Sequence, residues 1–106
     1  MENEINFVDA CLACVATCEA CITDCIESGN KECIKLCRDC ADICALCARF
    51  DARGSAYSKQ LHNLCAIICK ACALECIKHA SHHDSCKMCA EACSECATIC
   101  EEVSNM

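Results

Sequence analysis

Residues 86–100 read CKMCAEACSECATIC, with cysteine at positions 86, 89, 93, 96 and 100. The intervals between these cysteines alternate between three and four residues, which is the spacing of the inward-facing positions of a helix in a bundle. The stretch therefore predicts one amphipathic helix whose inner face is a row of thiols. We call such a row of positions a seam.

Three more segments carry the same alternation, and together the four segments contain all nineteen cysteines of the chain. In chain order the seam cysteines are Cys11, Cys14, Cys18, Cys21 and Cys25; Cys33, Cys37, Cys40, Cys44 and Cys47; Cys65, Cys69, Cys72 and Cys76; and Cys86, Cys89, Cys93, Cys96 and Cys100. A fourfold repeat of one cysteine-lined helix predicts an all-α protein.

Short breaks separate the four segments. Gly29-Asn30 and Gly54-Ser55 each join a glycine suited to the left-handed residue after a helix to a residue suited to the next N-cap. The third break lies at 80–84, where Ser81 or Asp84 can cap the last helix. The predicted helices span about 4–28, 31–51, 56–79 and 85–103. Short connections make neighbouring helices antiparallel, so we expect a single domain, residues 1–106, folded as an up-down-up-down four-helix bundle.

Cysteine fills nearly the whole interior of that bundle. Four helices with five inward positions each provide roughly twenty sites, and the chain has nineteen cysteines. One or two core cysteines act as small apolar residues, but nineteen that exclude Leu, Ile and Val from the seam require another explanation. On the third segment the seam continues as His62 before Cys65 and as His79 after Cys76.

Composition and charge exclude several classes of protein. The chain has no proline, two glycines and 3% aromatic residues, which is too few turn and strand residues for a β-sandwich or barrel. A net charge of −7 argues against a nucleic-acid partner. The N-terminus has no export signal, and no uninterrupted apolar stretch is long enough to span a membrane. We therefore expect a cytoplasmic protein without a membrane partner, where thiols stay reduced.

Reduced thiols at this spacing predict metal binding. Side chains three or four residues apart lie ~5–6 Å apart at Cβ, so two sulfurs of one helix can hold a two-coordinate ion. Soft Cu(I) accepts two or three thiolates, whereas zinc takes four ligands in a tetrahedron. Facing helices could supply such tetrahedra, so geometry alone leaves both metals open.

Charge favours Cu(I). One Cu(I) per bridging thiolate leaves the interior neutral, whereas about five Zn(Cys)₄ layers would bury about nine uncompensated negative charges. We therefore expect a store of multiple Cu(I) ions and not an enzyme. Two alternatives remain: a zinc-buffering metallothionein-like protein and a thiol redox protein. The redox alternative requires an exposed thiolate of low pKa, and metallothioneins use C-x-C and C-C pairs, which the chain lacks.

The four-helix pattern of C-x₃-C and C-x₂-C repeats resembles the bacterial copper storage proteins over nearly the whole chain. The resemblance implies a Cu(I)-filled four-helix bundle of the cytosolic type, assembled as a homo-oligomer, usually a tetramer, that exchanges copper with a donor or acceptor. It also implies that C-x₃-C pairs are the principal ligands: Cys14 with Cys18, Cys21 with Cys25, Cys33 with Cys37, Cys40 with Cys44, Cys65 with Cys69, Cys72 with Cys76, Cys89 with Cys93, and Cys96 with Cys100. Cys11, Cys47 and Cys86 lie outside these pairs, where we expect them to bridge helices at the bundle ends.

The predicted bundle has two different ends. One end gathers His79, His82 and His83, and near them Cys25, Ser28, Asn30, Cys33, Cys86 and Met88. The other gathers Phe7, Phe50, Tyr57, His62 and Val103, and we expect its aromatic and aliphatic groups to plug that end. Because neutral imidazole is an intermediate Cu(I) ligand, we expect copper to enter at the three-histidine end. Met88 is a flanking residue or an entry ligand, and His62 is a core histidine or an end ligand.

Overall fold

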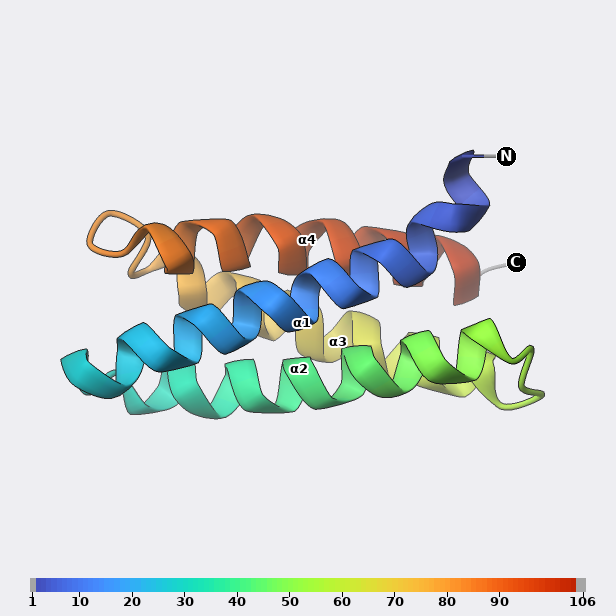
Figure 1. The fold of residues 1–106 in the computed structure, drawn as a ribbon, viewed down its shortest axis with the longest axis horizontal. Helices are drawn as coiled ribbons and strands as arrows, with labels where there is room; N and C mark the ends of the chain where they lie inside the picture. The colour runs from blue at the N-terminus through green and yellow to red at the C-terminus, as the bar shows by residue number, and fades with distance from the viewer. Residues whose placement is uncertain (1, 105–106) are drawn as a thin grey trace.

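The computed structural model describes the backbone of residues 2–104 and the side chains of residues 7–103. Four helices follow one another: α1 (Glu2–Ser28), α2 (Lys31–Ala52), α3 (Ser58–Ile77) and α4 (Asp84–Ser104). They run antiparallel to their neighbours in a bundle 40 Å long and 22 by 18 Å across (Figure 1). The predicted all-α four-helix architecture is confirmed.

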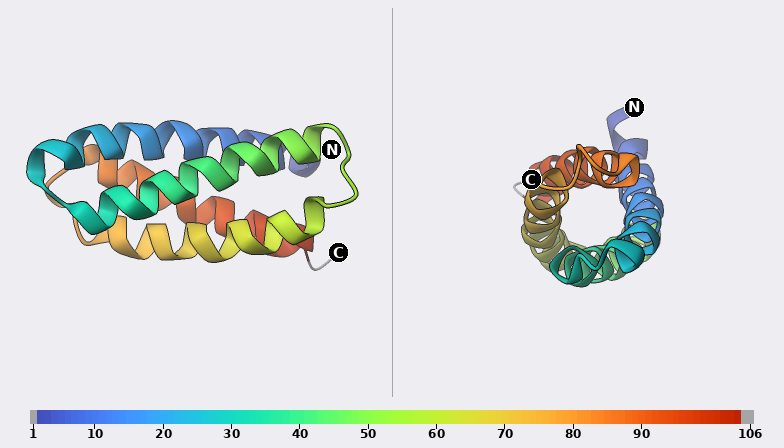
Figure 2. Two further views of the ribbon diagram at one scale, coloured as in Figure 1. Left: turned by 90° about the horizontal axis from the view of Figure 1, so that it is seen from below. Right: turned by 90° about the vertical axis from the view of Figure 1, so that its left-hand side faces the viewer.

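The helices enclose a single axis. α1 packs against α2 and α4, and α3 packs against α2 and α4. Within the described residues, the diagonal pairs α1 with α3 and α2 with α4 make no backbone contact. The end view in Figure 2 accordingly shows four helices in a ring. A side chain that points inward from one helix therefore meets side chains from three others.

Glycine ends the first two helices as the sequence indicates. Gly29 and Gly54 have φ values of +77° and +67°, which a residue with a Cβ rarely adopts. Asn30 precedes α2 but makes no side-chain cap bond to it. Its amide instead donates to the Ser28 hydroxyl at 3.2 Å.

The third helix is shorter than its predicted range of 56–79. It begins at Ser58, because Ser55 forms a turn of its own in which its hydroxyl accepts from the Tyr57 N–H at 3.1 Å. Ser55 is therefore not the N-cap of α3. At the other end the helix stops at Ile77, and residues 78–82 form a turn.

The interior consists of sulfur with a lining of alanine. All nineteen cysteine side chains are 0% exposed. Beside them are buried small residues that let neighbouring helices approach closely: Ala41, Ala48, Ala66, Ala90 and Ala97. The larger Ile43 is also buried, and other aliphatic side chains cover the thiol column from the flanks. The cysteines of the four seams are therefore themselves the core of the bundle.

Candidate metal centre

The thiols stack in layers along the axis. Counting along the four antiparallel seams places Cys11, Cys47, Cys65 and Cys100 in the first layer, followed by layers of Cys14, Cys44, Cys69 and Cys96; Cys18, Cys40, Cys72 and Cys93; Cys21, Cys37, Cys76 and Cys89; and Cys25, Cys33 and Cys86. In this count the twentieth position, beside the last three cysteines, belongs to His79. Each inner layer draws one thiol from every helix.

Sulfurs from different helices lie within bridging distance. The Sγ of Cys14 is 3.4 Å from that of Cys93 and 3.5 Å from that of Cys40. Cys21 and Cys86 are closest, at 3.2 Å. These separations are well above the ~2.05 Å of a disulfide, and all nineteen cysteines are free thiols.

Sulfurs on the same helix also approach one another. In six of the eight C-x₃-C pairs the two sulfurs are 3.7–4.0 Å apart: Cys21–Cys25, Cys40–Cys44, Cys65–Cys69, Cys72–Cys76, Cys89–Cys93 and Cys96–Cys100. A linear two-coordinate ion needs about 4.6 Å between its sulfurs, taking the ~2.3 Å bond of a zinc thiolate as a guide. Small rotamer changes would widen the sulfur–sulfur distance of these pairs to that value. Sulfurs on different helices are at least as close to one another as the sulfurs of these pairs.

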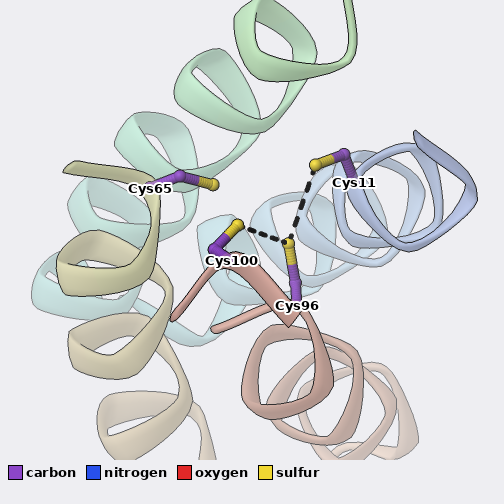
Figure 3. A group of neighbouring side chains, drawn as sticks. All are labelled: Cys11, Cys65, Cys96 and Cys100. Atoms are coloured by element: carbon purple, nitrogen blue, oxygen red, sulfur yellow. Dashed lines mark hydrogen bonds between the residues drawn. The ribbon is translucent and has the colours of Figure 1, made fainter. Parts of the chain in front are cut away.

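Groups of four thiols also converge. In at least five such groups, the four sulfurs all lie within 4.8 Å of one another. One of them combines Cys11 from α1, Cys65 from α3, and Cys96 and Cys100 from α4 (Figure 3). Another, around Cys14, Cys18, Cys40 and Cys93, lies halfway along the axis. The interior can thus supply two, three or four soft ligands at almost any level.

The thiols do not ionise alike. Hydrogen bonds from the thiols of Cys37 and Cys76 lower the pKa of Cys21 to about 6. Burial raises the pKa values of Cys25, Cys33 and Cys86 above the usual range. A thiolate in this column is stabilised by neighbours that keep their protons, so some thiols of the column ionise more readily than others.

At the three-histidine end, a carboxylate orients one imidazole. His79 Nε2 lies 3.1 Å from Glu75 Oε2, and Lys78 pairs with the other oxygen of Glu75 at 3.0 Å. With Nε2–H donated to Glu75, Nδ1 of His79 keeps its lone pair. The backbone N–H groups of His82 and His83 donate to the His79 carbonyl, which folds all three histidines into one turn. Met88 lies on the exposed face of α4 and not in the seam.

The opposite end is closed by fewer residues than the sequence indicates. Phe7 and His62 are each 3% exposed, and their ring centroids are 4.3 Å apart. Phe50 is half-buried beneath the Arg53 guanidinium, 4.8 Å from its ring. Tyr57 is exposed, so its predicted part in the closure is wrong. Val103 packs against the core from its edge.

Sequence reasoning missed two carboxylates that touch the histidines. Glu75 contacts His79, and Asp51 lies 3.6 Å from Nε2 of His62. The sequence contains a signal for each. Asp51 follows Cys47 by four residues and so continues the α2 seam, and Glu75 precedes His79 by one helical turn. Carboxylates that orient ligating histidines are common in metal sites.

Comparison with known proteins gives consistent matches. The model of the family described as copper storage protein matches residues 1–105. An uncharacterized cysteine-rich protein of Bacillus subtilis is 42% identical over 101 residues, covering 92% of each chain. Among solved structures, the Cu(I)-bound copper storage protein BsCsp3 superposes with a TM-score of 0.90 at 40% identity, covering 96% of this chain and 98% of that one. A cytosolic copper storage protein from Streptomyces lividans, described with five coppers, has a TM-score of 0.91 at 33% identity, covering 99% and 94%.

Metal uptake by this interior should release protons. Thiols bind soft metal ions as thiolates, and those of Cys25, Cys33 and Cys86 carry a proton at neutral pH because burial raises their pKa values. Anaerobic titration of the reduced protein with a soft monovalent ion in weak buffer, followed with a pH indicator, should show proton release that continues to saturation. Apparent affinity should fall as pH falls. Uptake without proton release would mean that thiols are not the ligands.

Proposed function

Because the chain belongs to the copper storage protein family, we propose that it stores many Cu(I) ions on the thiolates that fill its axis. The observation that supports this most strongly is the column of nineteen fully buried cysteines with sulfurs of different helices 3.2–4.0 Å apart. The relatives described as Cu(I)-bound and copper-loaded have the same fold. Each bound Cu(I) replaces a thiol proton, so filling leaves the interior close to neutral.

The state of the thiols supports a cytoplasmic location. Nineteen uncombined thiols within reach of one another would oxidise in an oxidising compartment. We therefore assign the protein to the cytoplasm, where a copper donor would load it and an acceptor would withdraw copper. A catalytic thiol is not expected, since a reactive cysteine needs access to its substrate and none of the cysteines is exposed.

Zinc buffering is the second candidate. The groups of four thiols within 4.8 Å of one another would suit tetrahedral Zn(Cys)₄ sites. Charge opposes it, because four thiolates around one Zn²⁺ leave two negative charges per site inside a core without other cations. The two candidates differ about fourfold in capacity.

Capacity is the decisive measurement. Reduced, metal-free protein should bind on the order of 15–20 Cu(I) per chain, because each ion needs only two or three shared thiolates. Anaerobic titration against a chromophoric Cu(I) competitor gives the number, and Ag(I) should reproduce it. Saturation at about five ions, or displacement of Cu(I) by equimolar Zn(II), would favour the zinc candidate.

We place copper entry at the end that carries His79, His82 and His83. By count along α3, His79 takes the position after Cys76, just past the end of the helix at Ile77, and its Nδ1 is left free by the Glu75 contact. His82 is exposed and His83 half-buried in the same turn. An incoming ion would thus meet imidazole first and then the stronger thiolates. Met88, on the outer face of α4, lies beside this path and not in it.

Replacing His79, His82 and His83 together by Ala should slow loading from a copper donor several-fold and leave final capacity nearly unchanged, since the thiols remain. Stopped-flow absorbance of the thiolate-to-Cu(I) charge-transfer band measures the rate. Tyr57→Ala, at the exposed surface of the opposite end, is the control and should load at the normal rate. Normal loading in the triple variant, or slow loading after substitution of Phe7 and Tyr57, would put the entrance at the other end.

We further propose that two copies of the chain associate through α3. Its outer face carries Leu64, Ile67, Ala71 and Leu74 at intervals of three, four and three, and Ile67 and Leu74 are 67% and 66% exposed. Such a stripe has the a/d spacing of a coiled-coil seam, and in a two-fold dimer it would face the same stripe of a second copy. A groove of about 570 Å³ between α3 and α4, lined partly by Leu74 and Ile77, extends this apolar surface. A tetramer would form if a second face pairs likewise.

The same stripe explains the composition of α3. By length and hydropathy alone it is the one helix in the described part of the chain that would pass as a membrane span, with mean hydropathy 1.3 and 33% of that window buried. A helix that is apolar on both faces is buried on both in an assembly. Its thiol face already lies inside the bundle, and its outer face would lie against the second copy.

Charges on this stripe should therefore separate the copies. Ile67→Glu combined with Leu74→Glu should reduce the molar mass measured by light scattering to that of one chain, 11.5 kDa, while Cu(I) capacity per chain stays the same. Lys59→Glu adds a carboxylate to an exposed position of the same helix that is not three or four residues from any member of the stripe, and it should leave the assembly intact. A double variant with unchanged molar mass would exclude α3 as the interface.

A further inference from the structure

The seams continue one layer beyond the cysteines at the closed end. Phe7 precedes Cys11 by four residues, Asp51 follows Cys47 by four, His62 precedes Cys65 by three, and Val103 follows Cys100 by three. Each interval continues the alternation of its helix, so these four residues form a terminal layer with one member from every helix. We call it the cap layer. Unlike the layers beneath it, it combines an aromatic ring, a carboxylate, an imidazole and an aliphatic side chain.

The imidazole of this layer lies on the axis. Phe7 belongs to α1 and His62 to α3, the diagonal helices whose backbones do not touch within the described residues. Their rings nevertheless meet at 4.3 Å between centroids with planes tilted by 60°. Only side chains that both point inward can meet in this way. His62 therefore covers the first thiol layer and does not line the outside of the bundle.

His62 is buried without a hydrogen bond. Neither Nδ1 nor Nε2 has a partner, although the residue is only 3% exposed. Nε2 lies 3.6 Å from Asp51 Oδ1, slightly beyond hydrogen-bonding distance. A buried polar group left unpaired is destabilising, so a position that retains one calls for a partner absent from the metal-free chain.

Two thiols of the first layer approach the turn of α3 that carries His62. Cys65 lies one turn further along α3, on the same inward face as His62. The thiol of Cys47, from α2, donates to the carbonyl of Leu61 at 3.3 Å, which places its sulfur beside the first turn of α3. Cys47 is thus directed at a backbone oxygen next to His62, whereas the other seam thiols are directed at sulfurs.

We propose that the cap layer is a mixed imidazole–thiolate site, in which His62 Nδ1 and the thiolates of Cys47 and Cys65 bind a terminal Cu(I) ion. Asp51 accepts the Nε2–H of His62 and so acts as a positioning residue, since a carboxylate behind a ligating imidazole fixes its tautomer and orientation. Imidazole is an accepted copper ligand. This site rests on the proposed storage of Cu(I), and it adds a nitrogen-ligated ion at the end opposite the entrance.

Nitrogen NMR of the intact protein tests the site directly. The reduced chain is labelled with ¹⁵N-histidine and titrated anaerobically with Cu(I), and then with Ag(I) as a spectroscopic substitute. We expect the Nδ1 resonance of His62 to shift as the chain fills and its Nε2 to remain protonated. His62→Phe identifies the resonance by its loss and keeps an aromatic ring against Phe7. If this variant does not fold, the ¹⁵N resonances of His62 are assigned in the unaltered chain and followed through the same titration.

Affinity supplies a second readout. Asp51→Ala should weaken the most affected Cu(I) ion about 10- to 100-fold, the range for loss of a carboxylate behind a ligating histidine, with the other ions unchanged. Asn63→Phe, which adds a ring on the exposed face of the same turn, should alter neither affinity nor the His62 resonances. If the chain fills with Cu(I) while both His62 nitrogens stay unshifted, the cap site is wrong and storage stands. If the chain takes up no Cu(I), the proposed storage function itself fails.

Discussion

Sulfur packs against sulfur along the whole axis of this bundle. Protonated, the thiols are small apolar groups and serve as an ordinary core. Ionised, they would be anions within 4 Å of one another, which a buried interior does not tolerate without cations. The same column is therefore stable either with protons or with metal ions, and monovalent soft ions exchange with protons one for one. Storage and folding use the same atoms.

The rest of the bundle compensates for a core made of small side chains. Cysteine has a small side chain, so four helices must approach closely to pack around a column of cysteines. The buried alanines beside the seam allow this close approach. Larger aliphatic residues flank the column and not its centre. A core of Leu and Ile would bury more apolar surface area, but it would leave no metal ligand on the axis. Apolar area appears instead on the outside of α3, where it is available to a second copy.

The two ends of the bundle differ because different residues follow the last cysteine of each seam. At one end the next positions are held by His79 and a turn containing two more histidines, with Glu75 as a partner. At the other end Phe7 and His62 meet across the axis, with Asp51 behind the imidazole. Each end thus pairs a histidine with a carboxylate. Only the first leaves its histidines near solvent, which is why we propose that end as the entrance.

The four helices, their inward faces and the chemistry of the axis can be read from the sequence, because an α-helix converts the three–four alternation of cysteines into one face. Which sulfurs meet depends on the tertiary structure, since Cys21 reaches Cys86 and Cys14 reaches Cys93 only through the relative stagger of α1 and α4. It also decided that Tyr57 stays outside, that His62 lacks a partner and that Asp51 and Glu75 stand behind the histidines. Those contacts depend on how helix ends and turns are placed across the axis, and no periodicity along one helix contains that information.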